Sequence, residues 1–389
     1  MLLEFAFGYK LEEIRSIVYI NSHVLNLQNI LIVIMNPIKI TMLGESLERQ
    51  GGIVSVEKLI LEETTSDIQI QHITTLPNGS TFHKVLVFLQ AIGELFWNLL
   101  NQRTDLIHIH VSDRGSAFRH SITTLIGWLF KKPVIIHTHS ADFHLFYSKL
   151  PQLLQQWLSW SFCKCTRFIV LSDSWKNFYI ENLGLKSEQV IVLPNPVKIP
   201  AQIPQRIDSK QIFFLFLGRI GERKGAFDLI KAFASMPVAQ QSQAKLVIAG
   251  DGDVEQARSL IPTLNLTDYI TILDWVDKEK RDDLLTKADV FVLPSYNEGL
   301  PMALLEAMSW GLAVITTAVG GIPEIVTQNQ NGLLVNPGNI QQLSEAMQSL
   351  IADENLRLSL GNNARVRVKP LDINNYFTSL RCIYTAVIN

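Results

Sequence analysis

Two carboxylates eight residues apart, Glu298 and Glu306, have the type and spacing of a ligand-binding pair. An apolar run at 288–294 predicts a buried strand just before them, and Gly299 and Pro301 open a helical pattern after it. Glu298 therefore falls in the loop at the carboxyl end of the strand, and Glu306 falls inside the following helix. Ligands of open parallel sheets bind at that edge, where carboxylates accept hydrogen bonds from hydroxyl groups. Because a helix amino terminus also attracts phosphate, the segment favours a sugar nucleotide.

A glycine-rich loop at 218–225 carries two cations, Arg219 and Lys224. It follows an apolar strand pattern and precedes a helical pattern, so both side chains belong at the carboxyl edge of a sheet. A guanidinium fork and an ammonium point charge suit diphosphate oxygens, and they stabilise a diphosphate as it leaves. The loop is not a Walker A loop, because Gly225 follows Lys224 where Ser or Thr is required. The alternative is a solvated basic turn.

Two further turns lie in the second half of the chain. The glycine loop at 320–326 precedes a proline-started helix, and its N–H groups either meet phosphate or the transferred sugar or form an ordinary turn. Asp251 and Asp253 resemble the DxD metal pattern of some sugar transferases, but they follow a strand as turn residues and no carboxylate cluster joins them in the sequence. We therefore expect a turn there and no metal.

His137 and His139 end a strand pattern at 133–139 in the first half. Alternate strand residues face the same side, so both imidazoles can point together. His139 is the residue nearer the strand end, and we expect it to hydrogen-bond a sugar hydroxyl or to assist proton movement. A metal site would need a third ligand, which the sequence does not indicate. The alternative is a structural pair.

Strand and helix patterns alternate from residue 38 onward, and this predicts an α/β protein with two Rossmann-like doubly wound domains and a cleft between them. A long helix near 82–101 is expected to face the core with Val85, Leu89, Ile92 and Phe96. The expected divisions are an N-terminal extension (1–37), an acceptor-side domain (38–198), a linker (199–210), a donor domain (211–372) and a C-terminal helix packing back on the first domain (373–389). We interpret residues 1–37 as an extension without function, which would place a true start at Met35, and the alternative is a real N-terminal element.

The composition of the 389-residue chain narrows the class of protein. A hydrophobic content of 47% with 18% charged residues fits globular domains, and a net charge of −2 gives no reason to expect nucleic acid. Cys163, Cys165 and Cys382 form no CxxC pair, so we expect no zinc or disulfide scaffold and a reducing, cytoplasmic location. No apolar run reaches the roughly 18–20 residues that span a bilayer.

Residues 114–176 carry eight Lys and Arg residues against two Asp residues, a net charge of +6 in a nearly neutral chain. Large aromatic residues alternate with these charges. We hypothesise that this half lies on the anionic inner face of the plasma membrane and takes a lipid-linked acceptor. The alternative is that the aromatic residues belong to the core. The aromatic residues are Trp128, Phe130, Phe146, Trp157, Trp160 and Phe162.

The chain resembles the retaining glycosyltransferases of family 4 in three motifs. They are GRIGERKG at 218–225, EGLPMALLE at 298–306 and GGIPE at 320–324. The likeness covers about residues 38–389, and it is most specific in the second half, where the Glu-x7-Glu motif is intact. Gly51-Gly52 and His139 match looser features of the first half. The resemblance implies the two-Rossmann fold called GT-B, a nucleotide-sugar donor as co-substrate, and no cofactor or metal.

The resemblance also implies which residues form the site. The catalytic candidates are His139 and Glu298. Arg219 and Lys224 would bind the diphosphate of the donor, and Glu306 would bind its ribose. Glu298, with the N–H groups of Gly299 and Leu300, would hold the transferred sugar. Trp275 and Val276 would lie near the base, and Gly51 and Gly52 would approach the donor phosphates or the acceptor.

The expected activity is transfer of a hexose, with retained configuration, from a nucleotide sugar to a glycan or polyprenyl-linked acceptor in cell-surface polysaccharide or exopolysaccharide biosynthesis. A weaker likeness of 110–120 and 137–143 to bacterial cell-surface glycan transferases supports this pathway. The alternatives are a GT-B-type epimerase, a phosphorylase with a pyridoxal lysine, or a non-catalytic sugar-nucleotide-binding protein.

Overall fold

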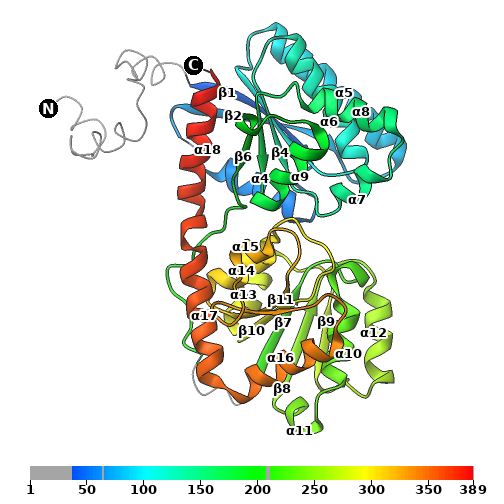
Figure 1. The fold of residues 1–389 in the computed structure, drawn as a ribbon, viewed down its shortest axis with the longest axis vertical. Coiled ribbons are helices and arrows are strands. Elements are labelled where there is room, and N and C mark those ends of the chain that lie inside the picture. The colour runs from blue at the N-terminus through cyan, green and yellow to red at the C-terminus, as the bar shows by residue number, and fades with distance from the viewer. Residues whose placement is uncertain (1–36, 64, 207–210, 389) are drawn as a thin grey trace, which may run out of the picture.

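The computed structural model of the chain describes residues 37–63, 65–206 and 211–388. Residues 1–36 of the predicted extension (1–37) and residues 207–210 of the predicted linker lie outside the described residues. Two six-stranded parallel sheets, one after the other in the chain, form two lobes (Figure 1). This two-domain α/β architecture confirms the predicted fold class.

The first sheet has the strand order β2-β1-β3-β4-β5-β6. All its neighbouring strands run parallel, as the alternation of strand and helix patterns requires. The strands are β1 (Ile38–Glu45), β2 (Ile68–Leu76), β3 (Leu106–Val111), β4 (Val134–Thr138), β5 (Arg167–Val170) and β6 (Val190–Val192). The helices are α4 (Gly52–Glu62), α5 (Thr81–Leu100), α6 (Gly115–Leu129), α7 (Phe143–Ser148), α8 (Gln152–Phe162), α9 (Asp173–Leu183) and the short η1 (Ser187–Gln189).

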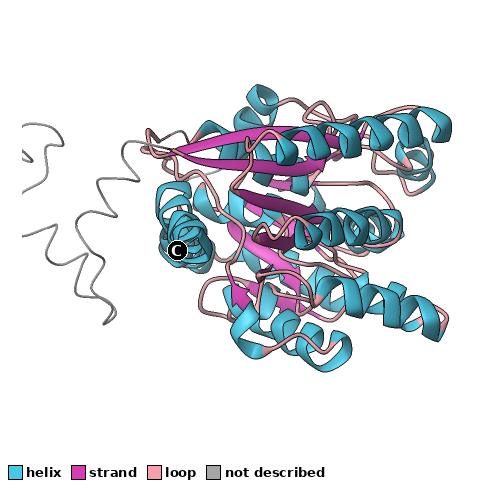
Figure 2. Ribbon diagram, turned by 90° about the horizontal axis from the view of Figure 1, so that it is seen from above, coloured by secondary structure: helices cyan, strands magenta, loops and turns pink. Residues whose placement is uncertain are grey.

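Helices cover both faces of this sheet (Figure 2). Helices α5, α6, α8 and α9 share one core cluster with alternate residues of the strands, and α4 shares the other cluster with α18 (Ile373–Ile388). The last helix therefore returns from the second lobe to the first, where Phe377 and Leu380 pack with Ile40 and Val56 (Figure 1).

The second sheet has the strand order β12-β11-β10-β7-β8-β9 and a single core cluster. The strands are β7 (Ile212–Leu217), β8 (Ala244–Ala249), β9 (Ile270–Leu273), β10 (Val290–Leu293), β11 (Ala313–Thr317) and β12 (Leu333–Val335). The helices are η2 (Glu222–Lys224), α10 (Ala226–Ala234), α11 (Val238–Gln241), α12 (Val254–Thr263), α13 (Lys278–Lys287), α14 (Met302–Ser309), α15 (Ile322–Ile325), α16 (Ile340–Ala352), α17 (Glu354–Val368) and η3 (Lys369–Leu371).

The strand order places the motif loops together. Strands β7 and β10 are neighbours, and the direction of the strand order reverses between them. The loop with Arg219 and Lys224 follows β7, while the loop with Glu298 follows β10. Because ligands of doubly wound sheets bind where the order reverses, this topology brings the basic and acidic motifs to one edge.

The predicted stripe of α5 is correct for Ile92 and Phe96, which pack against the core, and wrong for Val85 and Leu89. Val85 and Leu89 are 53% and 61% exposed, and the helix instead buries Ala91 and Leu95. Ala91, Leu95 and Leu99 belong to the core cluster of this sheet, whereas the large apolar side chains nearer the amino end of the helix are exposed. The amino-terminal half of α5 therefore presents an exposed apolar face.

Candidate active site

A cleft of about 430 Å³ lies between the two domains, at the carboxyl edges of both sheets. Its volume is in the range of pockets that bind small molecules. The structure brings all of the candidate residues to this one cleft. They are Gly51, Gly52, His139, Arg219, Lys224, Trp275, Val276, Glu298, Gly299, Leu300 and Glu306.

Lys224 and Glu298 form a close ion pair at the centre of the cleft. The Nζ atom of Lys224 lies 2.6 Å from Oε1 of Glu298, and the Ser295 hydroxyl donates to the same oxygen at 2.7 Å. Glu298 is buried and Lys224 is only slightly exposed. An ammonium group has three N–H donors, so Lys224 can hold Glu298 and also donate to diphosphate oxygens.

Arg219 pairs with Asp251 at 3.0 Å, and both side chains are largely exposed to solvent. An exposed ion pair contributes little stability, so the Arg219 guanidinium can exchange this partner for a ligand anion. In the DxD-like turn, the Asp251 carboxylate therefore has the Arg219 guanidinium as its partner. The sequence did not single out Arg223, which also lines the cleft and donates to the Asn297 carbonyl at 2.9 Å. Arg223 could have been predicted from the sequence, since it belongs to the same glycine-rich loop as Arg219 and Lys224.

Glu306 lies 3.2 Å from the guanidinium of Arg281, which α13 contributes to the cleft. Burial raises the pKa of the Glu306 carboxyl to about 7, and Arg281 opposes that shift. Its charge therefore changes near neutral pH. The sequence did not indicate Arg281, because the residue lies in a strongly charged helix that reads as a solvated surface.

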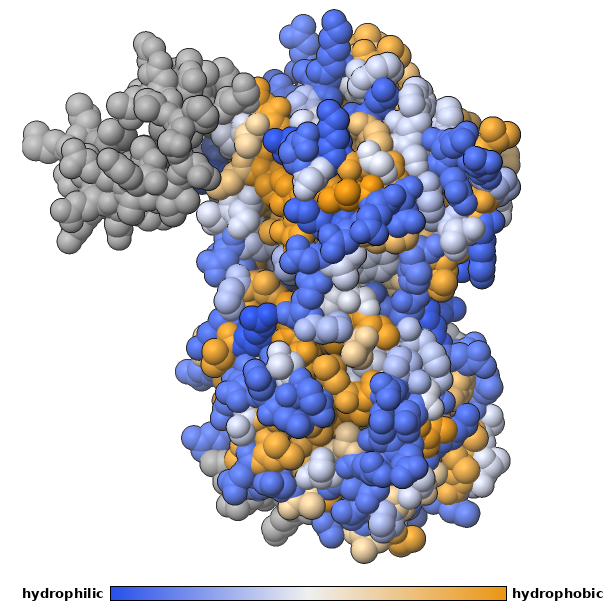
Figure 3. Space-filling view, in the orientation of Figure 1, coloured by the Kyte–Doolittle hydropathy of each residue, from blue (hydrophilic) through white to orange (hydrophobic). Residues whose placement is uncertain are grey.

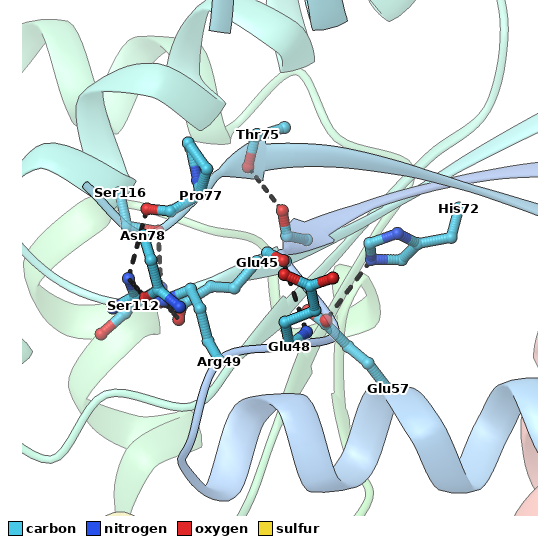
Figure 4. A network of polar contacts seen from close by, with 12 residues as sticks. Glu45, Glu48, Arg49, Glu57, His72, Thr75, Pro77, Asn78, Ser112 and Ser116 are labelled. Atoms are coloured by element: carbon cyan, nitrogen blue, oxygen red, sulfur yellow. Dashed lines mark hydrogen bonds and ion pairs between the residues drawn. The ribbon is translucent and has the colours of Figure 1, made fainter. Parts of the chain in front are cut away.

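The glycine loop of the first domain enters the cleft at the amino end of α4. Gly51 has a φ of 142°, a backbone conformation that favours glycine. A polar network next to this loop ties it to the sheet, and Figure 4 shows Arg49 bonded to Glu45 and to Asn78. The backbone N–H groups that begin α4 are thereby held at the cleft wall.

The GGIPE loop connects the domains directly. The Glu324 carboxylate accepts hydrogen bonds from the backbone N–H groups of Asp173 at 2.9 Å and Ser174 at 3.0 Å, at the amino end of α9. This placement also suits the positive end of the helix dipole. Asn195 adds a second bridge, donating to the Leu300 carbonyl at 2.7 Å. The sequence did not indicate either contact, because each joins residues more than 100 positions apart.

His139 is partly exposed at the cleft, and its Nε2 atom lies 2.9 Å from Nδ1 of His110. Burial lowers the pKa of His139 to about 3, so the ring is neutral at physiological pH and a weak base. This favours a hydrogen-bonding role over proton transfer. His137 packs beside it with ring centroids 4.2 Å apart, as expected from their alternation on one strand face.

The two domains, their facing sheet edges and the cleft between them define the GT-B class. A crystal structure of Anabaena Alr3699/HepE in complex with UDP matches with a TM-score of 0.71 at 18% identity, and the match covers 90% of this chain and 100% of that chain. This likeness shows the fold.

Sequence comparison identifies the family. The family model described as "Glycosyl transferases group 1" matches residues 200–367, and "Glycosyltransferase Family 4" matches residues 41–199. A GalNAc-alpha-(1->4)-GalNAc-alpha-(1->3)-diNAcBac-PP-undecaprenol alpha-1,4-N-acetyl-D-galactosaminyltransferase of Campylobacter jejuni is 31% identical, and the match covers 80% of this chain and 82% of that protein. A UDP-Gal:alpha-D-GlcNAc-diphosphoundecaprenol alpha-1,3-galactosyltransferase of Escherichia coli is 26% identical over 72% of this chain and 74% of that protein. This chain belongs to the family 4 glycosyltransferases.

Among the helices of the described residues, none combines the length and the apolar character needed to cross a membrane.

Proposed function

We propose that this protein is a retaining hexosyltransferase that moves a sugar from a nucleotide sugar to a lipid-linked glycan in cell-surface polysaccharide biosynthesis. The observation that carries the proposal is the Lys224–Glu298 contact, since it joins the predicted diphosphate and sugar contacts at the edge of one sheet. Arg219 and Glu306 line the same cleft.

The proposed chemistry uses the charges of the cleft on the leaving group. The bond between C1 of the sugar and the diphosphate oxygen breaks, and Lys224 and Arg219 stabilise the negative charge that develops on the diphosphate. The acceptor hydroxyl forms the new bond to C1 on the same face, and its proton passes to the departing phosphate. Glu298 and the N–H groups of Gly299 and Leu300 hold the sugar. No cofactor takes part in this scheme.

The rest of the donor extends away from the sugar. Glu306 accepts the ribose hydroxyls, and the base lies against Trp275 and Val276. UDP-sugars are the first candidates, because a structural neighbour was solved with UDP and one relative uses UDP-Gal by its name. The acceptor side is formed by the first domain, where Ser112 and Asp113 line the cleft. Both relatives named above act on sugars linked to undecaprenol through a diphosphate.

The test is an assay with a panel of UDP-, GDP- and ADP-sugars and an undecaprenyl-diphosphate-linked sugar. We expect nucleoside diphosphate release that requires the acceptor, and a product lipid heavier by one hexose unit. Conversion of the donor sugar to its epimer without transfer would indicate an epimerase instead. Tight donor binding with no turnover on any lipid-linked acceptor would favour a binding protein.

Donor affinity should depend on pH through Glu306. Its carboxylate must be ionised to accept two hydroxyl hydrogen bonds, and its pKa of about 7 lies well above the ordinary 4.5. We expect the affinity for a UDP-sugar to rise about tenfold between pH 6 and pH 8, because ionisation then goes nearly to completion. Titration calorimetry measures this, and a sugar nucleotide, unlike free UDP, has no phosphate that titrates in this range.

Glu306→Gln is the matched control, since it keeps the shape and removes the titration. It should bind more weakly at pH 8 and show a flat pH profile. Folding stability should change with pH in the opposite direction to donor affinity. Because the unfolded state ionises first, the raised pKa makes the folded state lose stability as pH rises from about 4.5 to 7, a loss that Glu306→Gln should remove. An equal pH dependence in both proteins would exclude Glu306 as the group.

We also propose that the first domain rests on an anionic membrane. Its helices α5, α6 and α8 expose an apolar surface, and the phenyl ring of Phe96 on α5 contacts that of Phe130 beyond the end of α6. Orange residues lie among blue ones along the outer edge of this lobe in Figure 3. The exposed apolar residues are Phe82, Val85, Leu86, Leu89, Trp97, Leu100, Ile122, Trp128, Leu129, Leu153, Leu154, Trp157 and Trp160.

Basic groups are interleaved with this apolar surface. Lys164 lies over the rings of Trp128 and Trp160, at 5.1 and 5.5 Å from their centroids, and Lys131 is exposed after α6. Tryptophan and lysine side chains together favour the interface of an anionic bilayer. Not every aromatic residue of the segment takes part, because Phe162 is fully buried and belongs to the core. A lipid-linked acceptor would reach the cleft from such a surface.

Trp157→Glu combined with Leu153→Glu should abolish flotation with anionic liposomes, because two charges then oppose insertion of α8. Far-UV circular dichroism checks the fold. Val238→Glu is the matched control, since Val238 is 73% exposed on α11 of the other domain and should leave flotation unchanged. Failure of the unmodified protein to float at low salt would exclude the membrane contact and leave the transferase assignment intact.

A further inference from the structure

Four histidines form a packed group inside the first domain, behind the cleft. His108 and His110 alternate on β3, and His137 and His139 alternate on the neighbouring β4. The register places His110 directly beside His137, and successive ring centroids lie between 4.2 and 5.6 Å apart. Only His139 reaches the cleft. The sequence showed no third ligand for a metal because the other two histidines lie on a different strand, 27 or more residues earlier.

The unused ring nitrogens of this group are unusual. Both ring nitrogens of His137 and the Nε2 atoms of His108 and His110 are buried without a hydrogen-bond partner within the described part of the chain. Buried polar atoms are nearly always bonded, and such exceptions can mark an ion or a water. As part of a core, these three imidazoles leave buried nitrogens without hydrogen bonds. As a group of ligands, the same nitrogens could all bind one metal ion.

We propose that His108, His110 and His137 form a buried site for a divalent transition-metal ion of the zinc type. Each offers one nitrogen, and the three ligand atoms lie within 4.8 Å of one another. Tetrahedral zinc with bonds of about 2.05 Å needs its ligands about 3.4 Å apart, so small rotations of the rings close the site. The set leaves a fourth position for water or another small ligand.

The surroundings support the assignment. Metal-bound histidines bond a second residue through their other nitrogen, which fixes the tautomer. His108 does so through Nδ1 to the Tyr384 hydroxyl at 2.7 Å, and His110 through Nδ1 to His139 at 2.9 Å.

The role of this ion is structural. It joins β3 to β4 and, through Tyr384, stabilises the docking of α18 on the first sheet. Through His110 it also positions His139 at the cleft. The ion would not touch the donor, since His108, His110 and His137 do not line the cleft. The inference therefore stands whether or not the chain transfers sugars.

The experiment measures metal bound by the untagged full chain. The protein is stripped with a chelator, dialysed and titrated with Zn²⁺ alone, and Co²⁺ serves as a spectroscopic probe of tetrahedral geometry. We expect about one Zn²⁺ per chain, a higher Tm in the loaded protein and a visible absorption band with Co²⁺. His137→Gln should remove binding, and Tyr384→Phe should weaken it about tenfold to hundredfold.

His120→Gln is the matched control. His120 is also fully buried in this domain, but both its ring nitrogens have a threonine partner, so this variant should still bind one ion. His137→Phe keeps the ring volume and tests the same point should His137→Gln fail to fold. Absence of stoichiometric binding to the folded chain, or binding that survives in His137→Phe, would overturn the proposal.

Discussion

Lys224→Ala is expected to lower kcat/KM for sugar transfer by about 30- to 1000-fold, a loss of about 2–4 kcal/mol of transition-state stabilisation. The reason for this loss is the fixed position of the Lys224 ammonium group in the cleft. Lys224 is held at the carboxyl end of β7 by a buried partner, Glu298, at 2.6 Å, so its charge is fixed where a diphosphate departs. Fixed charges in a partly dry cleft act more strongly than mobile ones in water. Steady-state kinetics with saturating acceptor measure the effect.

The removal of Lys224 also leaves Glu298 buried without its cation, so some unfolding must be separated from lost chemistry. The double variant Lys224→Ala/Glu298→Gln removes both charges, and we expect it to recover stability and to remain inactive. Lys231→Ala is a matched control, because Lys231 is half exposed on α10 in the same domain. A Lys224→Ala enzyme that retains wild-type kcat/KM would show that the cation does not face the leaving group.

Gly320→Ala should lower the rate of transfer about a hundredfold and lower stability, since this position has no space for a side chain. A Cβ atom there would lie 1.8 Å from the Glu298 carbonyl oxygen, and the residue has a φ of 55°. The loop after β11 must then move away from the loop that carries Glu298, and a displacement of about 1 Å in a positioning loop can cost about a hundredfold in rate. Thermal unfolding and kcat together measure this.

Gly93→Ala is the control for that substitution. Gly93 lies inside α5, where a Cβ atom would meet nothing within 4 Å. Alanine in a helix interior stabilises by about 0.5–1 kcal/mol relative to glycine, so this variant should be as active as the wild type and slightly more stable. Equal effects of the two substitutions would show that the close approach at Gly320 does not matter for the site.

The fold was largely predictable because buried parallel strands appear as short apolar runs. Residues 212–217 and 290–293 are such runs, and the structure makes them the central strands β7 and β10. The loops after such strands meet at one edge, which is why Glu298 and Lys224 could be placed together without coordinates. Glu298 and Glu306 likewise share the cleft although they are eight residues apart, because one lies in the loop and the other in the helix.

Short elements and unpartnered helix faces were not predictable. Strand β12 has only three residues and no pattern of its own, so the sequence did not indicate it. For α5 the apolar residues lie on more than one face of the helix, so the pattern did not show that Ala91 and Leu95 face inward. A periodic pattern cannot distinguish a core face from an exposed apolar one.

Contacts between distant segments were also hidden. The bond from Asn195 to the Leu300 carbonyl and the pairing of Arg281 with Glu306 depend on how loops from separate elements meet. The histidine group shows the same limit, since His110 meets His137 only through the register of β3 and β4. Sequence spacing carries no information of this kind.

The most direct test of the donor site is a crystal structure of the chain with an intact UDP-sugar. Our account predicts diphosphate oxygens within about 2.7–3.2 Å of Lys224 and Arg219, and ribose hydroxyls bonded to Glu306. The sugar should lie against Glu298, between the two domains. A nucleotide bound with its diphosphate away from the loop that follows β7 would contradict the account.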